Sequence, residues 1–133
     1  MKIKLSNSFE ITKNSRPYII AEIGSNHNGD MKLCKKIIDS AKKAGVDCVK
    51  FQYFNEKTIF SKKTYEDNFF IADDYRNRSD FNLKDIVKKY SISITELKEM
   101  QKYCKRINLD FLVTPFSYKE VNEIEKLGVV TFK

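Results

Sequence analysis

Apolar and polar positions along this chain alternate in a way that predicts strands followed by helices. Residues 18–23 form an apolar run typical of a buried strand. In the segment that follows, apolar residues recur every three or four positions, which predicts a helix with one buried stripe. This stripe consists of Leu33, Cys34, Ile37, Ile38, Ala41 and Ala44. Asp30 is placed to cap the start of the helix, and Gly45 follows its end.

The same succession recurs further along the chain. Further strands are predicted at residues 47–53, 109–113 and 129–133. Helical spacing predicts two more helices at 95–107 and 117–127, each opened by a Ser-x-x-Glu sequence typical of a capping box. Strands that alternate with helices over short connections form right-handed βαβ units, so we expect an α/β fold with a parallel sheet.

Two segments depart from this alternation. Residues 2–16 are polar and carry no clear periodicity. Residues 54–90 form a long, charged and aromatic insert, in which we expect a small packing element at 68–71 and a helical turn at 83–90. An insert of this length is usually functional or mobile.

Composition predicts one globular domain. The 133 residues are 41% hydrophobic and 32% charged, which suits a packed core and excludes wholesale disorder. The sequence contains no apolar run of membrane-spanning length and no signal-peptide core, so we expect no membrane partner. The three cysteines, Cys34, Cys48 and Cys104, form no C-x-x-C pair. We therefore expect buried free thiols in a reducing cytoplasm.

The formal net charge of +7 is compatible with nucleic acid, an anionic surface or small phosphorylated and carboxylated molecules as partners. The lysines, however, are interspersed with acidic residues along the predicted helices, as in Glu96, Lys98 and Glu99. This arrangement is typical of solvated helix faces. We therefore predict no nucleic-acid surface.

Polar residues occur near the carboxyl ends of all four predicted strands. Because side chains alternate across a strand, residues two apart share a face. Glu22, Lys50, Gln52, Thr114 and Lys133 would then form a polar floor at the carboxyl-terminal mouth of a sheet or barrel. Charged residues inside a parallel sheet are costly unless they are paired or used. Lysines and a threonine hydroxyl suit a carboxylate or phosphate, and a glutamate moves protons.

Two simpler interpretations remain open for these residues. Glu22 and Lys50 could form a buried ion pair that only stabilises the core. Lys133 could be a solvated chain end.

The loop at residues 21–30 gathers two acids, two amides, two glycines and the only histidine of the chain. His27 could be a metal ligand, a catalytic acid or a hydrogen-bonded loop residue. No second histidine and no cysteine cluster accompany it, so we predict a loop or substrate-edge role rather than a metal site. Gly24 and Gly29 do not form a dinucleotide fingerprint and are expected to allow sharp turns.

These sequences resemble the N-acetylneuraminate (sialic acid) synthase family. The resemblance rests on AEIGSNHNG at residues 21–29, VKFQ at 49–52, TPFS at 114–117 and FK at 132–133, which occur in the family's order. It implies a (β/α)8 TIM-type barrel, of which residues 1–133 would be the N-terminal half, about four βα units. It also implies a homodimer and a small C-terminal antifreeze-like domain.

The resemblance further implies a reaction and a cofactor. Phosphoenolpyruvate would condense with an N-acetylated amino sugar such as N-acetylmannosamine, giving a nine-carbon 2-keto acid and releasing phosphate. Enzymes of this kind need a divalent metal, commonly Mn²⁺ or Mg²⁺. Sugars that lead to legionaminic or pseudaminic acid remain open as substrates, and the 54–90 insert is a candidate for that choice.

The resemblance also assigns roles to individual residues. Glu22 would be the acid/base group, Lys50 and Thr114 would hold the phosphoenolpyruvate carboxylate, and Lys133 would meet the phosphate. The sugar site or its rim would be lined by Gln52, Asn26, His27 and Phe116.

The sequence stops inside the fourth predicted strand, with no counterpart of the family's metal-binding histidines, C-terminal half-barrel or antifreeze-like domain. We therefore expect an N-terminal portion of a synthase that is inactive alone and has an unpaired strand edge. Two alternatives remain: another TIM-barrel lyase or aldolase of phosphorylated substrates, and a basic α/β domain that binds anions without catalysis.

Overall fold

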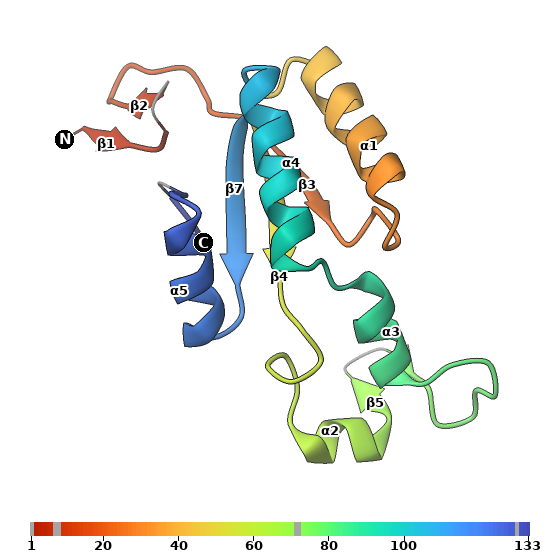
Figure 1. Cartoon of the computed structure of the whole chain (residues 1–133). Coiled ribbons are helices and arrows are strands. Elements are labelled where there is room, and N and C mark those ends of the chain that lie inside the picture. The colour runs from red at the N-terminus through yellow and green to blue at the C-terminus, as the bar shows by residue number, and fades with distance from the viewer. Residues whose placement is uncertain (1, 7–8, 71–72, 130) are drawn as a thin grey trace.

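A parallel sheet with helices on one face forms the centre of the molecule (Figure 1). The computed structural model describes residues 2–6, 9–70, 73–129 and 131–133. Within these ranges the sheet has three strands in the order β3 (Ile20–Gly24), β4 (Cys48–Tyr53) and β7 (Asp110–Pro115). Each neighbouring pair runs parallel. The predicted α/β fold is confirmed for these three strands, with ends that differ from the predicted ones by one or two residues.

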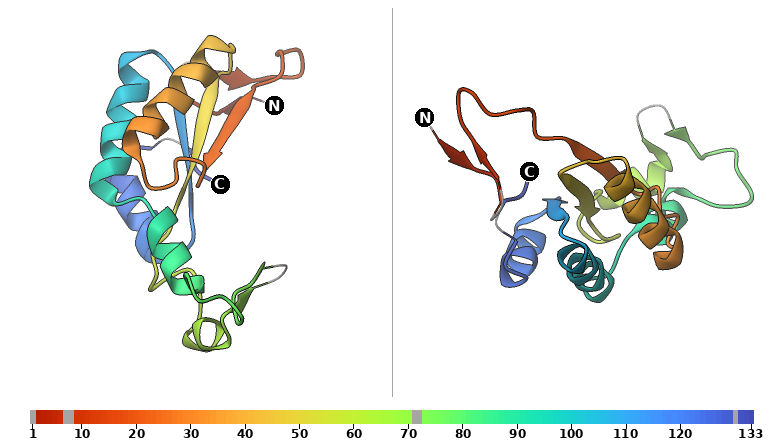
Figure 2. Two further views of the ribbon diagram at one scale, coloured as in Figure 1. Left: turned by 90° about the vertical axis from the view of Figure 1, so that its right-hand side faces the viewer. Right: turned by 90° about the horizontal axis from the view of Figure 1, so that it is seen from above.

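Helices α1 (Met31–Lys43), α4 (Ile94–Arg106) and α5 (Tyr118–Lys126) cover the same face of the sheet (Figure 2). Local sequence sets where the first two begin. The side chain of Asp30 accepts hydrogen bonds from the first turn of α1, and Ser93 and Glu96 form a reciprocal capping box on α4. Both caps were predicted from the sequence and are confirmed.

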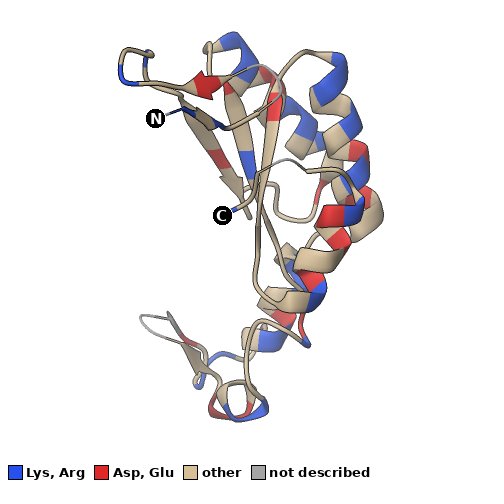
Figure 3. Cartoon of the chain, turned by 90° about the vertical axis from the view of Figure 1, so that its left-hand side faces the viewer, with Lys and Arg blue, Asp and Glu red and all other residues tan. Residues whose placement is uncertain are grey.

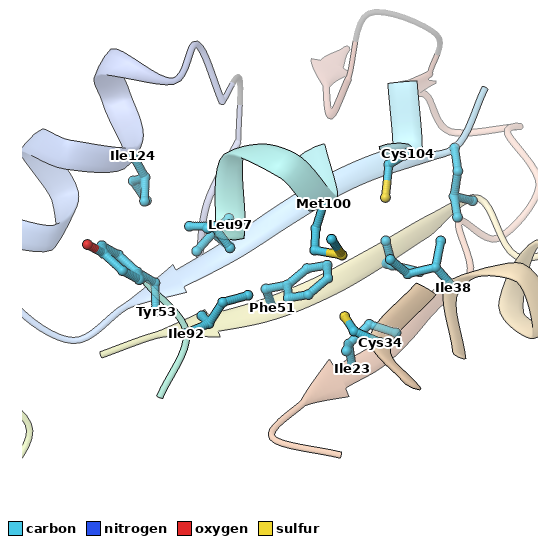
Figure 4. Packing of buried hydrophobic residues seen from close by; sticks show 13 residues of the cluster. Ile23, Cys34, Ile38, Phe51, Tyr53, Ile92, Leu97, Met100, Cys104 and Ile124 are labelled. Carbon is cyan, nitrogen blue, oxygen red and sulfur yellow. The ribbon is translucent and has the colours of Figure 1, made fainter. Parts of the chain in front are cut away.

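The hydrophobic core lies between the sheet and these helices (Figure 4). The strands contribute side chains from one face of the pleat, and the helices contribute their apolar stripes. Fully buried members are Ile23, Val49, Phe51 and Val113 from the strands, and Cys34, Ile38, Leu97, Met100, Cys104 and Ile124 from the helices. The three predicted buried thiols are confirmed: all are free, and all are buried.

The opposite face of the sheet carries the polar strand residues. None of the three helices packs on it (Figure 2). Figure 3 shows that most charged residues of the chain lie along the helices and loops, whereas the strands carry few. The few charged and polar side chains of the sheet are therefore separate from most of the charged residues of the chain.

The insert lies beyond the carboxyl ends of the strands (Figure 1). It contains α2 (Lys62–Asp67), an antiparallel hairpin of β5 (Phe69–Phe70) and β6 (Asp73–Asp74), and α3 (Leu83–Tyr90). A second apolar cluster of Phe54, Leu83 and Val87 holds it together, with Ile59, Phe60, Tyr65 and Tyr75 packed around. The helical turn predicted at 83–90 is confirmed as α3. Of the element predicted at 68–71, Phe69–Phe70 is a strand, and residue 71 lies outside the described residues.

Both ends of the described chain differ from prediction. The polar start contains a short antiparallel hairpin, β1 (Ile3–Lys4) with β2 (Glu10–Ile11). The fourth strand expected at 129–133 is parallel and next to β7 as predicted, but the pairing is limited to one bridge between Val113 and Phe132. Thr131 donates a hydrogen bond of 2.7 Å to the carbonyl of Leu5, which ties this segment to the amino-terminal hairpin instead.

No helix in the described ranges combines the length and the hydropathy that a membrane-spanning segment requires.

Candidate functional site

Regular alternation along β3 sets the orientation of Glu22. Glu22 pairs with Lys50 in register and shares its helix-free face, whereas the next residue, Ile23, points into the core and is 0% exposed. A bulge follows Glu22, since Gly24 pairs with Phe51 and Ile23 has no partner on β4. Gly24 has a φ of +50°, a conformation that glycine adopts without strain.

Lys50 and Glu22 form an ion pair at the middle of that face. The ammonium nitrogen of Lys50 contacts Oε1 of Glu22. The lysine side chain is 9% exposed, whereas the glutamate side chain is 61% exposed. A charge buried to this degree needs a partner. The pair therefore places one shielded cation and one accessible carboxylate side by side.

Gln52 and Thr114 extend this group toward the carboxyl ends of the strands. They are register partners on β4 and β7. The hydroxyl of Thr114 is buried and has no hydrogen-bond partner among the described residues. Buried hydroxyls are normally satisfied. Thr114 thus offers an unused donor on the same face as Lys50, one strand away.

The loop after β3 uses several of its polar groups within itself, but the buried Nε2 of His27 has no hydrogen-bond partner among the described residues. Asn26 donates through its backbone and side-chain nitrogens to the carbonyl of Ile23, at 3.0 and 2.9 Å. His27 is 0% exposed, and its Nδ1 accepts from the backbone N–H of Gly29 at 3.0 Å. Burial lowers the pKa of His27, which keeps the ring neutral. Both side chains shape the loop.

The remaining predicted site residues lie nearer the edge. Phe116 is 43% exposed and makes an edge contact with Phe54, with ring centroids 5.6 Å apart. Lys133 is exposed, and its backbone N–H donates to the carbonyl of Val113 at 3.1 Å. The structure thus brings Glu22, Lys50, Gln52 and Thr114 together on adjacent strands. Lys133 joins them through its backbone contact with β7.

One buried acid of this region was not predicted as part of the site. Glu120 on α5 is 0% exposed, and its carboxylate accepts hydrogen bonds from the loops that follow β4 and β7. Its place in a Ser-x-x-Glu sequence indicated only a helix start. The side chain of Ser117 does accept from the Glu120 N–H at 3.4 Å, but the Glu120 carboxylate turns to Phe116 rather than back to Ser117.

The described residues do not offer a ligand set for the divalent metal that the family resemblance implies. Within the described ranges, no three side chains of His, Cys, Asp or Glu gather closely enough to hold an ion. Glu22 is already paired with Lys50, and the buried His27 already accepts a hydrogen bond at its Nδ1. We therefore assign this chain no step through a metal.

Several known proteins are similar to this chain. The model of the NeuB family matches residues 37–133. An N,N'-diacetyllegionaminic acid synthase of Campylobacter jejuni is 36% identical over 115 residues, covering 86% of this chain and 34% of that protein. An N-acetylneuraminate-9-phosphate synthase of Drosophila melanogaster is 33% identical over 116 residues, covering 87% of this chain and 30% of that protein. The chain thus spans about a third of the length of the curated relatives it matches.

Comparison with solved structures gives the same result as comparison with sequences. The crystal structure of the N-acetylneuraminic acid (sialic acid) synthetase of Leptospira borgpetersenii, in complex with citrate, superposes with a TM-score of 0.78 at 26% identity. The superposition covers 99% of this chain and 40% of that one. These similarities confirm the resemblance predicted from the four motifs. They also confirm the fold class, a partial barrel of the TIM type.

Proposed function

We propose that this chain, which belongs to the NeuB family, provides the phosphoenolpyruvate-binding wall of a barrel active site that makes a nine-carbon 2-keto sugar acid. The observation that carries the proposal is the group of Glu22, Lys50 and Thr114 on the helix-free face. These residues lie on three adjacent strands, and one of them has an unused buried hydroxyl. In barrels of this type, such residues near the carboxyl ends of strands form the active site.

Phosphoenolpyruvate is an anion with a carboxylate and a phosphate. Lys50 is fixed by its pairing with Glu22, and Thr114 has a free donor on the neighbouring strand. An ammonium and a hydroxyl arranged in this way are suited to two oxygens of one carboxylate. We assign the carboxylate to these two residues and the phosphate to Lys133, whose backbone is bonded to β7.

Glu22 is the acid/base group of the proposal. In the reaction, carbon 3 of phosphoenolpyruvate forms a bond to the aldehyde carbon of the open-chain sugar, and the aldehyde oxygen gains a proton. Water then adds at carbon 2 and loses a proton, and the intermediate collapses with loss of phosphate. An exposed carboxylate next to the site of the bound anion is placed to move such protons. A bound substrate carboxylate would also share Lys50 with it.

The sugar side of the site is proposed for Gln52 and Phe116, with Asn26 and His27 shaping the loop at its rim. Gln52 is the best placed, since it is the register partner of Thr114. The similar proteins are named for legionaminic acid, N-acetylneuraminate 9-phosphate and pseudaminic acid. These names support the proposal of an N-acetylated amino sugar as the substrate class, and the choice within that class is left to experiment.

Three further parts of the proposal concern the whole protein. Free buried cysteines support a reducing compartment, and we propose the cytoplasm. A divalent metal would polarise the sugar aldehyde, with ligands other than the residues described here. A homodimer remains an expectation from the family. Membership of the NeuB family favours this synthase over an aldolase-like lyase or an anion-binding domain without catalysis.

Binding of phosphoenolpyruvate to the 133-residue chain tests the proposal. In isothermal titration or ligand-observed NMR, Lys50→Met and Thr114→Val should each weaken binding at least about tenfold, since each removes a polar contact to a charged ligand. Lys36→Met, at an exposed position on the outer side of α1, is the charge-matched control and should bind normally. Equal weakening by all three variants would show non-specific attraction and overturn the proposal.

A turnover assay tests whether this chain is only part of the site. We expect no keto acid above background when phosphoenolpyruvate, an N-acetylated amino sugar and Mn²⁺ are incubated with the chain. Clear turnover would show that the 133 residues form a complete site and would overturn the proposal that they supply one wall of it.

A further inference from the structure

Glu120 is a carboxylate with no access to solvent. It lies in the first turn of α5 and is 0% exposed. Burying an ionised carboxylate is costly unless hydrogen bonds replace the lost water. The contacts that stabilise it therefore indicate what the residue does.

These contacts come from two different loops. Oε1 accepts from the side-chain nitrogen of Asn55 at 3.0 Å and from the hydroxyl of Thr58, both in the loop after β4. Oε2 accepts from the backbone N–H of Phe116 at 2.9 Å, in the loop after β7. One carboxylate thus joins segments that are about 60 residues apart in sequence. A residue needed only to start α5 would not reach across to the other loop.

Both loops continue directly from the proposed substrate-binding strands. Asn55 is three residues after Gln52, and Phe116 is two residues after Thr114. The ring contact between Phe54 and Phe116 joins the same two loops on their apolar side. Gln52 and Thr114 are themselves register partners on β4 and β7. The hydrogen bonds of Glu120 therefore join the two strands just beyond these two residues.

We propose that Glu120 is a positioning residue, which holds the ends of β4 and β7 at the spacing that substrate binding requires. The inference rests on the proposed function for its substrate, phosphoenolpyruvate. The part of the inference that concerns the spacing of β4 and β7 depends only on the hydrogen bonds of Glu120. Glu120 is not one of the groups assigned to phosphoenolpyruvate and acts through the side chains of Asn55 and Thr58 and the backbone N–H of Phe116.

Glu120→Ala and Glu120→Gln in the 133-residue chain test the proposal, with Glu125→Gln as control. Glu125 is on the same helix but is exposed, whereas Glu123 is unsuitable because it accepts a 2.6 Å hydrogen bond from Tyr53 at the end of β4. In Glu120→Ala, hydrogen exchange at the Phe116 amide should accelerate at least about tenfold. The NMR signals of Gln52 and Thr114 should shift, and phosphoenolpyruvate affinity should fall at least about tenfold.

Glu120→Gln should recover part of the affinity, because its amide oxygen still accepts from one loop. Glu125→Gln should leave exchange at Phe116, the two signals and binding unchanged. If Glu120→Ala does not fold, Thr58→Val removes one donor and should shift Gln52 with a smaller loss of affinity. A Glu120→Ala chain that is less stable but binds with wild-type affinity and unshifted signals would overturn the proposal.

The two proposals fail in different ways. If the wild-type chain does not bind phosphoenolpyruvate, the proposed function fails. The positioning role is then decided by the Gln52 and Thr114 signals: a shift in Glu120→Ala but not in Glu125→Gln supports it, and unshifted signals overturn it.

Discussion

A β-carbon on Gly29 would lie 2.6 Å from the carbonyl oxygen of Lys89. Gly29 belongs to the loop between β3 and α1, and Lys89 lies near the end of α3 in the insert. Gly29 also has a φ of +76°, in the region that favours glycine. Two independent constraints therefore require glycine here, and the insert packs directly on the backbone of the loop that carries Asn26 and His27.

Gly29→Ala should destabilise the chain more than the same change elsewhere. The left-handed backbone alone costs about 1–2 kcal/mol for a residue with a β-carbon. The contact with a backbone carbonyl adds to this, since backbone atoms cannot move aside as a flexible side chain does. Urea unfolding would measure the total. Gly45→Ala is the matched control, because Gly45 has a φ of +82° with nothing within 4 Å of the added carbon. Equal losses in both variants would show that the contact with Lys89 does not matter.

The polar face could be predicted from the sequence because its cause is local. Side chains two apart on a strand share a face, and short βαβ connections place successive parallel strands side by side. These two rules suffice to bring Glu22 next to Lys50 and Gln52 next to Thr114, as the register shows.

Other features depend on contacts distant in sequence or carry no periodic signal. The bridge from Glu120 to Asn55 spans 65 residues, and a Ser-x-x-Glu sequence is equally consistent with a simple cap. α2 has no buried residues among those described, so it lacks the apolar stripe by which a helix is predicted. Strands of two residues, such as β1 and β2, are too short to show an alternation.

Lys50→Met should separate stability from substrate binding. Breaking an ion pair is costly when the charge left behind is buried. In Lys50→Met the remaining carboxylate of Glu22 is 61% exposed and stays hydrated, whereas in Glu22→Ala the remaining ammonium is buried. We expect Lys50→Met to unfold at an unchanged or higher urea concentration. Glu22→Ala should lose about 1–3 kcal/mol, because the largely buried ammonium of Lys50 would then lack its partner.

This comparison decides between the two interpretations of the ion pair. If the pair exists to bind an anion, Lys50→Met abolishes phosphoenolpyruvate binding without a loss of stability. A large loss of stability in Lys50→Met, comparable to that of Glu22→Ala, would instead identify a pair that only holds the core together.

Acid should weaken the contact between the segment before β3 and the start of β4. The guanidinium of Arg16 donates two hydrogen bonds to Asp47, one of 2.8 Å, and the N–H of Ile19 donates another of 2.8 Å. These bonds, those from Arg16 above all, lower the pKa of Asp47 from 3.8 to about 2. A carboxyl whose pKa is lower in the folded state stabilises the fold above its unfolded pKa and loses this effect as the pH falls through the folded value. The loss therefore lies between about pH 4 and pH 2.

Asp47→Asn isolates this contribution from those of the other acids. The free energy of unfolding of the wild-type chain should fall more steeply between pH 4 and pH 2 than that of the variant. Urea titrations at several pH values would measure both curves. Parallel curves would contradict the assignment to Asp47.

The buried cysteines should be nearly unreactive in the folded chain. Thiol alkylation requires the thiolate, and burial raises the pKa of Cys34 from 9.0 to about 11 and those of Cys48 and Cys104 to about 12. A rise of this size lowers the thiolate fraction at pH 8 about 100-fold or more. Iodoacetamide labelling followed by mass spectrometry should therefore modify all three only slowly at pH 8, and rapidly once urea unfolds the chain.

Because Cys34 and Cys104 lie between α1, α4 and the sheet, their labelling rates also report how often these helices separate from the sheet. Labelling of either residue in the folded chain at the rate found in urea would show that this part of the core does not form.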